Sequence, residues 1–255
     1  MEATPAVSAD GRAVYVGSHD GRVYGLDAQN GAELWRFKTG DRVDSSAAVS
    51  RDGHALYVGS NDGILYGLST ATGTALWRYA AKGAINFSSP ALSPDGGTVY
   101  VGSNDGSLYA CDARMGTRKW ALDTGGALES SPAVSSDGET VYIGSYNKSV
   151  LAVDASRGVM RWAFRTSERV VSSPRLSPDG QTVFIGVRDG SLYALDAISG
   201  AKRFSAPLGD CVESTARVSD DGATVFIGAQ CETQQCAKAP AADRSMYAVS
   251  TGTVA

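Results

Sequence analysis

A glycine recurs along the chain at a nearly constant period of 42 or 43 residues. Each copy closes a short apolar run of the form Val/Leu-Tyr/Phe-Val/Ile-Gly. The six copies are Gly17, Gly59, Gly102, Gly144, Gly186 and Gly228. A repeat of roughly 40 residues made only of short apolar runs and turns has room for about four strands, which is one blade of a β-propeller. The period therefore predicts an all-β propeller of six blades.

Asp-Gly pairs mark the turns inside each repeat. One pair separates the first strand from the second: Asp10-Gly11, Asp52-Gly53, Asp95-Gly96, Asp137-Gly138, Asp179-Gly180 and Asp221-Gly222. Another follows the second strand in four repeats: Asp20-Gly21, Asp62-Gly63, Asp105-Gly106 and Asp189-Gly190. Such a pair between apolar runs indicates a hairpin with a primed turn, because glycine adopts the positive φ that this turn needs. With a fourth strand that carries Trp or Phe, each repeat is predicted to be a four-stranded meander.

The repeat runs through all 255 residues without a break, so we predict a single domain, residues 1–255. The expected repeats are 1–42, 43–84, 85–127, 128–169, 170–211 and 212–255. The sequence ends just after Ser250-Thr251-Gly252, where a fourth strand with its tryptophan is expected, so the last blade is predicted to lack its outer strand. Either the ring closes on a three-stranded blade, or further blades have been lost and an exposed edge would favour self-association.

The apolar runs predict blades that stack face to face. Val99, Tyr100 and Val101 are apolar at consecutive positions, as expected for a strand covered on both sides. The central aromatic residue of each run is therefore predicted to lie between blades, without a binding role: Tyr15, Tyr57, Tyr100, Tyr142, Phe184 and Phe226. The same core position is predicted for the tyrosines of the third strand: Tyr24, Tyr66, Tyr109, Tyr193 and Tyr247.

A second motif joins the third and fourth strands. Residues 110–120 resemble the tryptophan motif of quinoprotein repeats, the pyrroloquinoline quinone (PQQ) type of propeller, which reads Ala-x-Asp-x-x-x-Gly-x-x-x-Trp. Five copies cover essentially the whole chain. The resemblance implies that their aromatic residues lock neighbouring blades together: Trp35, Trp77, Trp120, Trp162 and Phe204. The same repeat builds quinone dehydrogenases, the outer-membrane assembly lipoprotein of Gram-negative bacteria, and sensor or scaffold domains, so it does not by itself indicate an enzyme.

The resemblance also implies what a quinone dehydrogenase of this type would contain. Such enzymes usually have eight blades, hold the quinone between a tryptophan and a ring formed by two adjacent cysteines, and bind calcium with Glu, Asn and Asp. This chain has six repeats, no adjacent cysteine pair, and every tryptophan in the structural motif. We therefore expect neither PQQ nor calcium and no catalytic residue. A dehydrogenase fragment or subunit that binds quinone and calcium is the alternative.

Other catalytic and macromolecular classes are also disfavoured. The only histidines, His19 and His54, are expected in turns on opposite faces of the propeller and are interpreted as exposed turn residues, so a Ser/His/Asp hydrolase is not supported. The net charge is −4, and the 23 Lys and Arg residues are scattered, so no nucleic-acid footprint is predicted. No membrane insertion is predicted, because the longest apolar runs are single strands rather than the roughly 20 residues of a spanning helix.

The last repeat departs from the pattern through an insertion of about a dozen residues after Gly228, which contains Cys231 and Cys236. Cys211 lies in the connection that precedes this repeat, on the same predicted face. We predict one disulfide, either Cys231 to Cys236 or Cys211 to one of them, and hence an oxidising compartment, periplasmic or extracellular. A zinc site is the rival, but no fourth ligand is evident. Cys111 is predicted to be an inert buried thiol.

The starts of the innermost strands provide a second candidate site. Their alignment places a carboxylate in four of six blades at the mouth of the central channel: Glu2, Asp44, Phe87, Glu129, Val171 and Glu213 are equivalent. Converging carboxylates could bind a cation or a basic peptide. A solvated rim partly neutralised by Arg42, Lys82 and Arg169 is the favoured alternative. We predict a non-catalytic binding or assembly scaffold whose protein or peptide partner binds the face that carries the insertion and the channel mouth.

Overall fold

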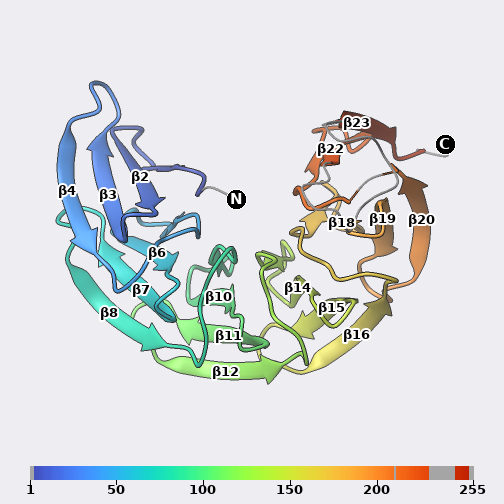
Figure 1. Ribbon diagram of the computed structural model, residues 1–255, viewed down its shortest axis with the longest axis horizontal. Coiled ribbons are helices and arrows are strands. Elements are labelled where there is room, and N and C mark those ends of the chain that lie inside the picture. The colour runs from blue at the N-terminus through green and yellow to red at the C-terminus, as the bar shows by residue number, and fades with distance from the viewer. Residues whose placement is uncertain (1–2, 210, 230–244, 253–255) are drawn as a thin grey trace. The chain divides into compact units, whose positions relative to one another are not determined.

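The computed structural model describes residues 3–209, 211–229 and 245–252 (Figure 1). These residues form strands and turns without any helix, in five antiparallel sheets of four strands and one of three. No helix in the described part of the chain could therefore cross a membrane. Glu2, Cys231 and Cys236, which the sequence singles out, lie outside the described residues.

Each sheet is a meander that begins with a two-residue inner strand, followed by longer strands. The first three sheets contain β1 (Ala6–Val7), β2 (Ala13–Ser18), β3 (Arg22–Asp27), β4 (Glu33–Lys38), β5 (Ala48–Val49), β6 (Ala55–Gly59), β7 (Ile64–Ser69), β8 (Ala75–Ala80), β9 (Ala91–Leu92), β10 (Thr98–Gly102), β11 (Ser107–Asp112) and β12 (Arg118–Asp123). The other three contain β13 (Ala133–Val134), β14 (Thr140–Ser145), β15 (Ser149–Asp154), β16 (Met160–Arg165), β17 (Arg175–Leu176), β18 (Thr182–Val187), β19 (Ser191–Asp196), β20 (Lys202–Pro207), β21 (Arg217–Val218), β22 (Thr224–Ala229) and β23 (Ser245–Ser250). The predicted four-stranded blades are thus confirmed, and the last sheet has three strands among the residues that the structure describes.

The chain divides into two compact units, Met1–Val134 and Ser135–Ala255. Strands β1 to β13 lie in the first unit and β14 to β23 in the second. The sequence period does not mark this division, because the repeats on its two sides are alike. The single domain expected over residues 1–255 stays a prediction.

The recurrent glycine allows close packing between successive repeats. The side chain of Val43, just before β5, occupies the space that a Cβ atom of Gly17 would need, and Ile85 does the same at Gly59. Val212 and Gly186 repeat this arrangement in the second unit. A larger residue at the glycine position would overlap the neighbour, which explains why the glycine recurs with the blade period.

The first hairpin of each repeat differs from the primed turn that the sequence predicts. Gly11 has a φ of 71°, but neither residue before it has a positive φ. Its N–H donates to the Ser8 carbonyl over 2.9 Å, and the Ser8 hydroxyl donates to Asp10 Oδ1 over 2.7 Å. The prediction was wrong about turn type because only the residue after the turn needs the left-handed conformation, as in a type I turn followed by a glycine bulge.

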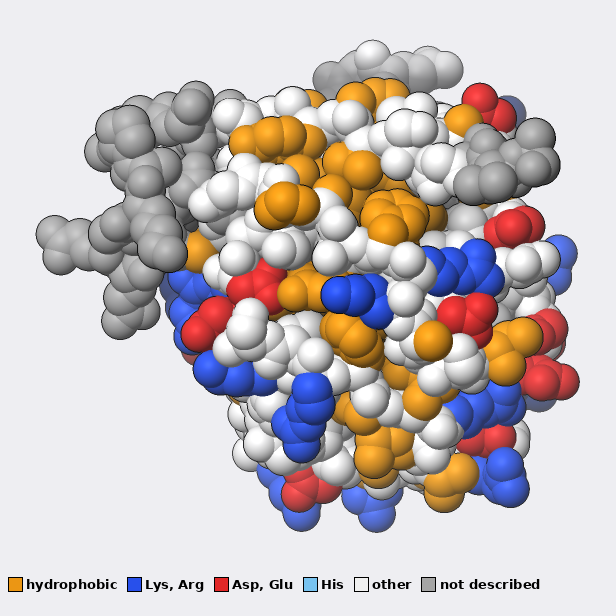
Figure 2. Space-filling view, turned by 90° about the vertical axis from the view of Figure 1, so that its right-hand side faces the viewer, with side chains coloured by type: hydrophobic (Ala, Val, Ile, Leu, Met, Phe, Trp, Pro, Cys, Tyr) orange, Lys and Arg blue, Asp and Glu red, His pale blue; other side chains and the backbone are white. Residues whose placement is uncertain are grey.

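Five of the six central aromatic residues are buried between sheets, as predicted. Tyr15 and Phe184 are 3% and 2% exposed, but Phe226 is 44% exposed, so the prediction was wrong for the last repeat. Within the second unit no described strand covers the side of β22 and β23 that carries Phe226 and Met246. The upper part of the view in Figure 2 shows mainly hydrophobic and uncharged side chains, with most charged ones below.

The tryptophans of the fourth strands bridge to the next repeat within each unit. The Trp35 indole donates from Nε1 to the Thr70 carbonyl over 2.7 Å, and Trp77 donates to the Ala113 carbonyl over 3.0 Å. In the second unit Trp162 donates to the Ala197 carbonyl over 3.0 Å. Gly116, with a φ of 70°, lies against the Trp77 ring. These contacts support the predicted blade-locking role of the tryptophans, which stays a prediction.

Alanine substitutions at two equivalent glycines separate the indole contact from backbone strain. Gly31 and Gly116 have φ values of 74° and 70°, but only Gly116 lies against an indole. We expect Gly31→Ala to lose about 1 to 2 kcal/mol from the left-handed backbone alone. Gly116→Ala is expected to lose about 1 to 3 kcal/mol more, because its Cβ overlaps Trp77. Urea unfolding of both variants measures the difference, and equal losses would contradict the predicted role of Trp77.

Candidate functional site

A repeated backbone hydrogen bond defines one end of the blades. The Val43 N–H donates to the Ser18 carbonyl over 3.0 Å, and the Val212 N–H donates to the Val187 carbonyl over 3.2 Å. Each bond joins the start of one repeat to the end of the second strand of the repeat before it. The residues that follow the two bonded positions are therefore neighbours. We call these neighbours the loop face: His19, Asp44, Asn61, Asn86, Asn104 and Glu129 in the first unit, and Tyr146, Val171, Arg188 and Glu213 in the second.

The loop face corrects the sequence alignment in the third repeat. Asn86 follows Ile85, which fills the space at Gly59, as Asp44 follows Val43 at Gly17. Phe87 was aligned with Asp44 because the spacing there is 43 residues, but the extra residue lies within this segment. An amide therefore occupies the position that the alignment gave to an aromatic ring.

Asp44 is a buried carboxylate with partners on both oxygens. Its side chain is 2% exposed, and His19 Nε2 lies 2.6 Å from Oδ1. On Oδ2, the Arg42 Nε atom lies at 3.4 Å and Asn61 Nδ2 donates over 3.0 Å. The His19 contact lacks hydrogen-bond geometry. His19 was expected to be an exposed turn residue, and the structure places it beside Asp44, one of the predicted channel-mouth residues.

The other acidic candidates are also accompanied by partners. Arg188 Nε lies 2.9 Å from Glu213 Oε1, and this arginine side chain is only 12% exposed. Glu129 is half-buried and has interaction partners of its own. Among the residues that the structure describes, no three His, Cys, Asp or Glu side chains are grouped so that they could hold a metal ion. The charge compensation at Asp44 and Glu213 supports the interpretation of the acidic positions as a neutralised rim.

Three asparagines in the first unit were not singled out by the sequence analysis. The Oδ1 atoms of Asn61, Asn86 and Asn104 are buried and have no hydrogen-bond partner in the described chain. Asn61 and Asn104 both stand second in a Ser-Asn-Asp-Gly loop, a recurrence that could have drawn attention to them. A buried amide oxygen without a donor is unfavourable, and a ligand N–H or O–H could satisfy it.

The cysteines differ in environment. Cys111 on β11 is fully buried and free, and burial raises the pKa of its thiol to about 12. This environment matches the inert thiol that the sequence predicts. Cys211 is buried and disulfide-bonded. Its candidate partners, Cys231 and Cys236, lie outside the described residues, so the pairing stays a prediction.

The residues described do not fit a PQQ and calcium site. Trp77, whose indole could otherwise stack on a quinone, is 9% exposed, lies against Gly116 and donates its N–H to Ala113. The chain has no adjacent cysteine pair, and the described residues lack a grouped set of three candidate metal ligands. We therefore assign no chemical step to a quinone.

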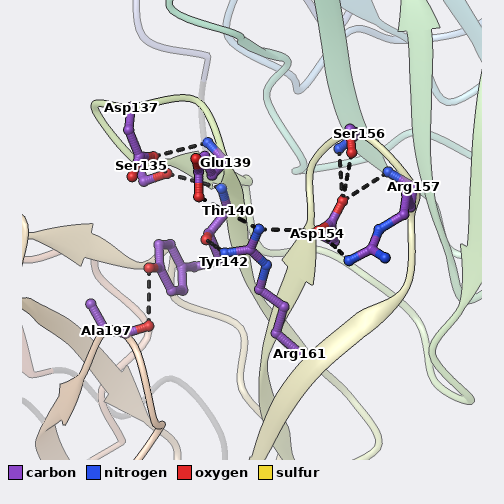
Figure 3. A network of polar contacts seen from close by, with 10 residues as sticks. All are labelled: Ser135, Asp137, Glu139, Thr140, Tyr142, Asp154, Ser156, Arg157, Arg161 and Ala197. Carbon is purple, nitrogen blue, oxygen red and sulfur yellow. Dashed lines mark hydrogen bonds and ion pairs between the residues drawn. The ribbon is translucent and has the colours of Figure 1, made fainter.

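The most extensively bonded carboxylate lies away from the loop face, at the end of β15 (Figure 3). Asp154 is buried and accepts hydrogen bonds from Arg157 Nη2 and Arg161 Nη2, each over 3.0 Å, and from the Ser156 hydroxyl over 2.8 Å. The bond from Arg157 is the main cause that holds the pKa of Asp154 well below its usual range. Arg161 also donates to the Thr140 hydroxyl over 2.9 Å. With its oxygens occupied, Asp154 stabilises a turn and has no free position for a ligand.

The depressed pKa of Asp154 predicts a pH-dependent contribution to stability. The carboxylate stabilises the folded protein fully above its unfolded pKa of about 3.9, and this contribution declines as the pH falls towards the lower folded value. Asp154→Asn should lower the unfolding free energy by about 1 to 3 kcal/mol at pH 7, and the gap to wild type should shrink below about pH 4. Asp220→Asn, at an exposed residue, is the control. Thermal unfolding at several pH values measures the gap, and a gap independent of pH would contradict the assignment.

A thiol count tests the predicted disulfide. The chain has four cysteines, so one disulfide leaves two free thiols in the denatured, unreduced protein. Reduction should raise the count to four, and peptide mapping should identify whether Cys211 pairs with Cys231 or Cys236. Four free thiols before reduction would refute the disulfide.

Comparisons with known proteins agree with this fold. The family model described as "Beta-alanine-activating enzyme, beta-propeller" matches residues 1–174. Among solved structures, the chain is similar to the protein BamB from Moraxella catarrhalis, with a TM-score of 0.72 and 22% sequence identity over 89% of this chain and 70% of that one. No curated protein sequence matches. At this identity the structural likeness shows the fold, a β-propeller.

Proposed function

Because the chain belongs to the β-propeller family of the β-alanine-activating enzyme, we propose that it is a non-catalytic scaffold that binds a protein partner through its loop face. The proposal assigns it no quinone, calcium or catalytic residue. It also places the protein in an oxidising compartment, periplasmic or extracellular, on the strength of the disulfide at Cys211. The insertion with Cys231 and Cys236 is proposed as part of the binding face.

The observation that carries the proposal is a contrast between the two ends of the blades. At one end all six repeats use the same Ser-x-Asp-Gly hairpin, in which the serine hydroxyl donates to the aspartate. At the loop face, the equivalent position holds four different residue types over five repeats: His19, Asn61, Asn104, Tyr146 and Arg188. Positions that only maintain a repeated fold have no reason to vary, and repeat proteins bind partners through the face where their repeats differ.

The first unit supplies the chemistry for recognition. The Oδ1 atoms of Asn86 and Asn104 are covered but lack a donor, and both residues are only partly buried, so a partner that displaces the covering atoms could supply N–H donors. Asp44 is already compensated by Arg42 and accepts a hydrogen bond from Asn61, so Asn86 and Asn104 are left as the acceptors without a partner. This arrangement favours recognition through hydrogen bonds over capture of a metal ion.

Paired alanine variants test which end binds. Asn86→Ala with Asn104→Ala removes two acceptors from the loop face, and Gln29→Ala with Gln181→Ala removes two exposed amides from the opposite end. A partner that is retained on the immobilised wild-type chain is first crosslinked and identified by mass spectrometry. The amount of this partner that each variant retains is then measured. At about 1 kcal/mol for each hydrogen bond, retention by the asparagine variant should fall roughly tenfold or more, and the glutamine variant should match wild type. Equal retention by both variants would contradict the proposal.

A further inference from the structure

The inner strands form a second repeated surface. In the first unit the Thr4 N–H donates to the Ser46 hydroxyl over 2.8 Å, and the Ser46 N–H donates to the Ser89 hydroxyl over 2.9 Å. Ser89 in turn donates its N–H to the Ser131 hydroxyl over 2.9 Å. Successive repeats are thus in direct contact at this position. Two residues further along, each inner strand begins with a small residue: Ala6, Ala48, Ala91 and Ala133.

In the second unit this alanine is replaced by arginine. Arg175 begins β17 and Arg217 begins β21, and these two strands lie side by side. Both arginines keep the register of the alanines, because Arg175 is opposite Phe184 and Arg217 is opposite Phe226, as Ala48 is opposite Tyr57. Since four repeats fold with alanine here, the blade itself does not require the arginines.

The two guanidinium groups lack a counter-charge. Neither the Arg175 side chain nor the Arg217 side chain takes part in an ion pair or hydrogen bond with any residue that the structure describes, and Glu213, four residues before Arg217, is paired with Arg188. Burial, and then the positive charge of Arg217, lower the pKa of Arg175. Both arginines are nevertheless exposed to solvent, and two like charges on adjacent strands repel each other, so an anion between them would be stabilised.

We propose that Arg175 and Arg217 form an anion site that binds the carboxylate or phosphate oxygens of a ligand, with one guanidinium contributed by each of β17 and β21. The planar fork of arginine donors matches both kinds of oxyanion. The site uses no residue of the loop face, so the result of its test does not depend on whether the proposed function is correct.

Calorimetric titration with inorganic phosphate and with a hexaglutamate peptide, at an ionic strength fixed with sodium chloride, tests the site. The wild-type chain should bind at least one of them. The double variant Arg175→Ala/Arg217→Ala should bind at least tenfold more weakly, because it loses charged hydrogen bonds. It should still fold, because it restores the alanine of the other repeats, and its circular dichroism spectrum checks this. Lys202→Gln, at an exposed residue of β20, should bind like wild type.

The two probes distinguish the source of the anion. Binding of phosphate alone would support the site with a phosphorylated ligand, and binding of the peptide alone would support it with an acidic peptide. Two outcomes would overturn the site: wild type binds neither probe, or the folded double variant binds as tightly as wild type.

Discussion

Within each unit, a fourth-strand tryptophan contacts the repeat that follows it, and this contact is made by Trp35, Trp77 and Trp162. A single blade is apolar on both faces and cannot bury both of them alone. The Trp77 indole meets this requirement in two ways, because it donates its N–H to the Ala113 carbonyl over 3.0 Å and packs against Gly116. The aromatic ring of Tyr57 lies on the same indole, with centroids 5.7 Å apart. One side chain therefore joins the outer strand, the core of its own blade and the turn of the next.

The predicted locking of blades by this contact leaves other positions without a structural role. The hairpin end of every blade is held by its serine, aspartate and glycine, and these residues do not change between repeats. At the loop face the repeats share a backbone hydrogen bond, such as that from Val43 to Ser18, and this bond does not depend on the side chains, which differ. The arginines at the start of β17 and β21 show the same freedom on the inner strands. Within each unit, the hairpin residues that are the same in every repeat therefore lie apart from the loop-face and inner-strand residues that differ.

The sequence was sufficient for the features that recur. Six glycines revealed the blade period, and the space occupied by Val43 at Gly17 shows the physical reason for it. The exceptions were harder to predict. Asn86 was missed because one extra residue in its repeat shifts the alignment, and the exposure of Phe226 depends on which neighbouring strands cover it. The contact of His19 with Asp44 joins residues that are 25 positions apart, and no local pattern reports such a pair.

The central claim, that this propeller is a scaffold without a cofactor, is tested most directly by native mass spectrometry of the purified, unreduced chain. The measured mass should be that of the polypeptide alone, lighter by the two hydrogens of one disulfide. Additional mass that matches a quinone together with calcium would contradict it and would identify the chain as a cofactor-binding protein.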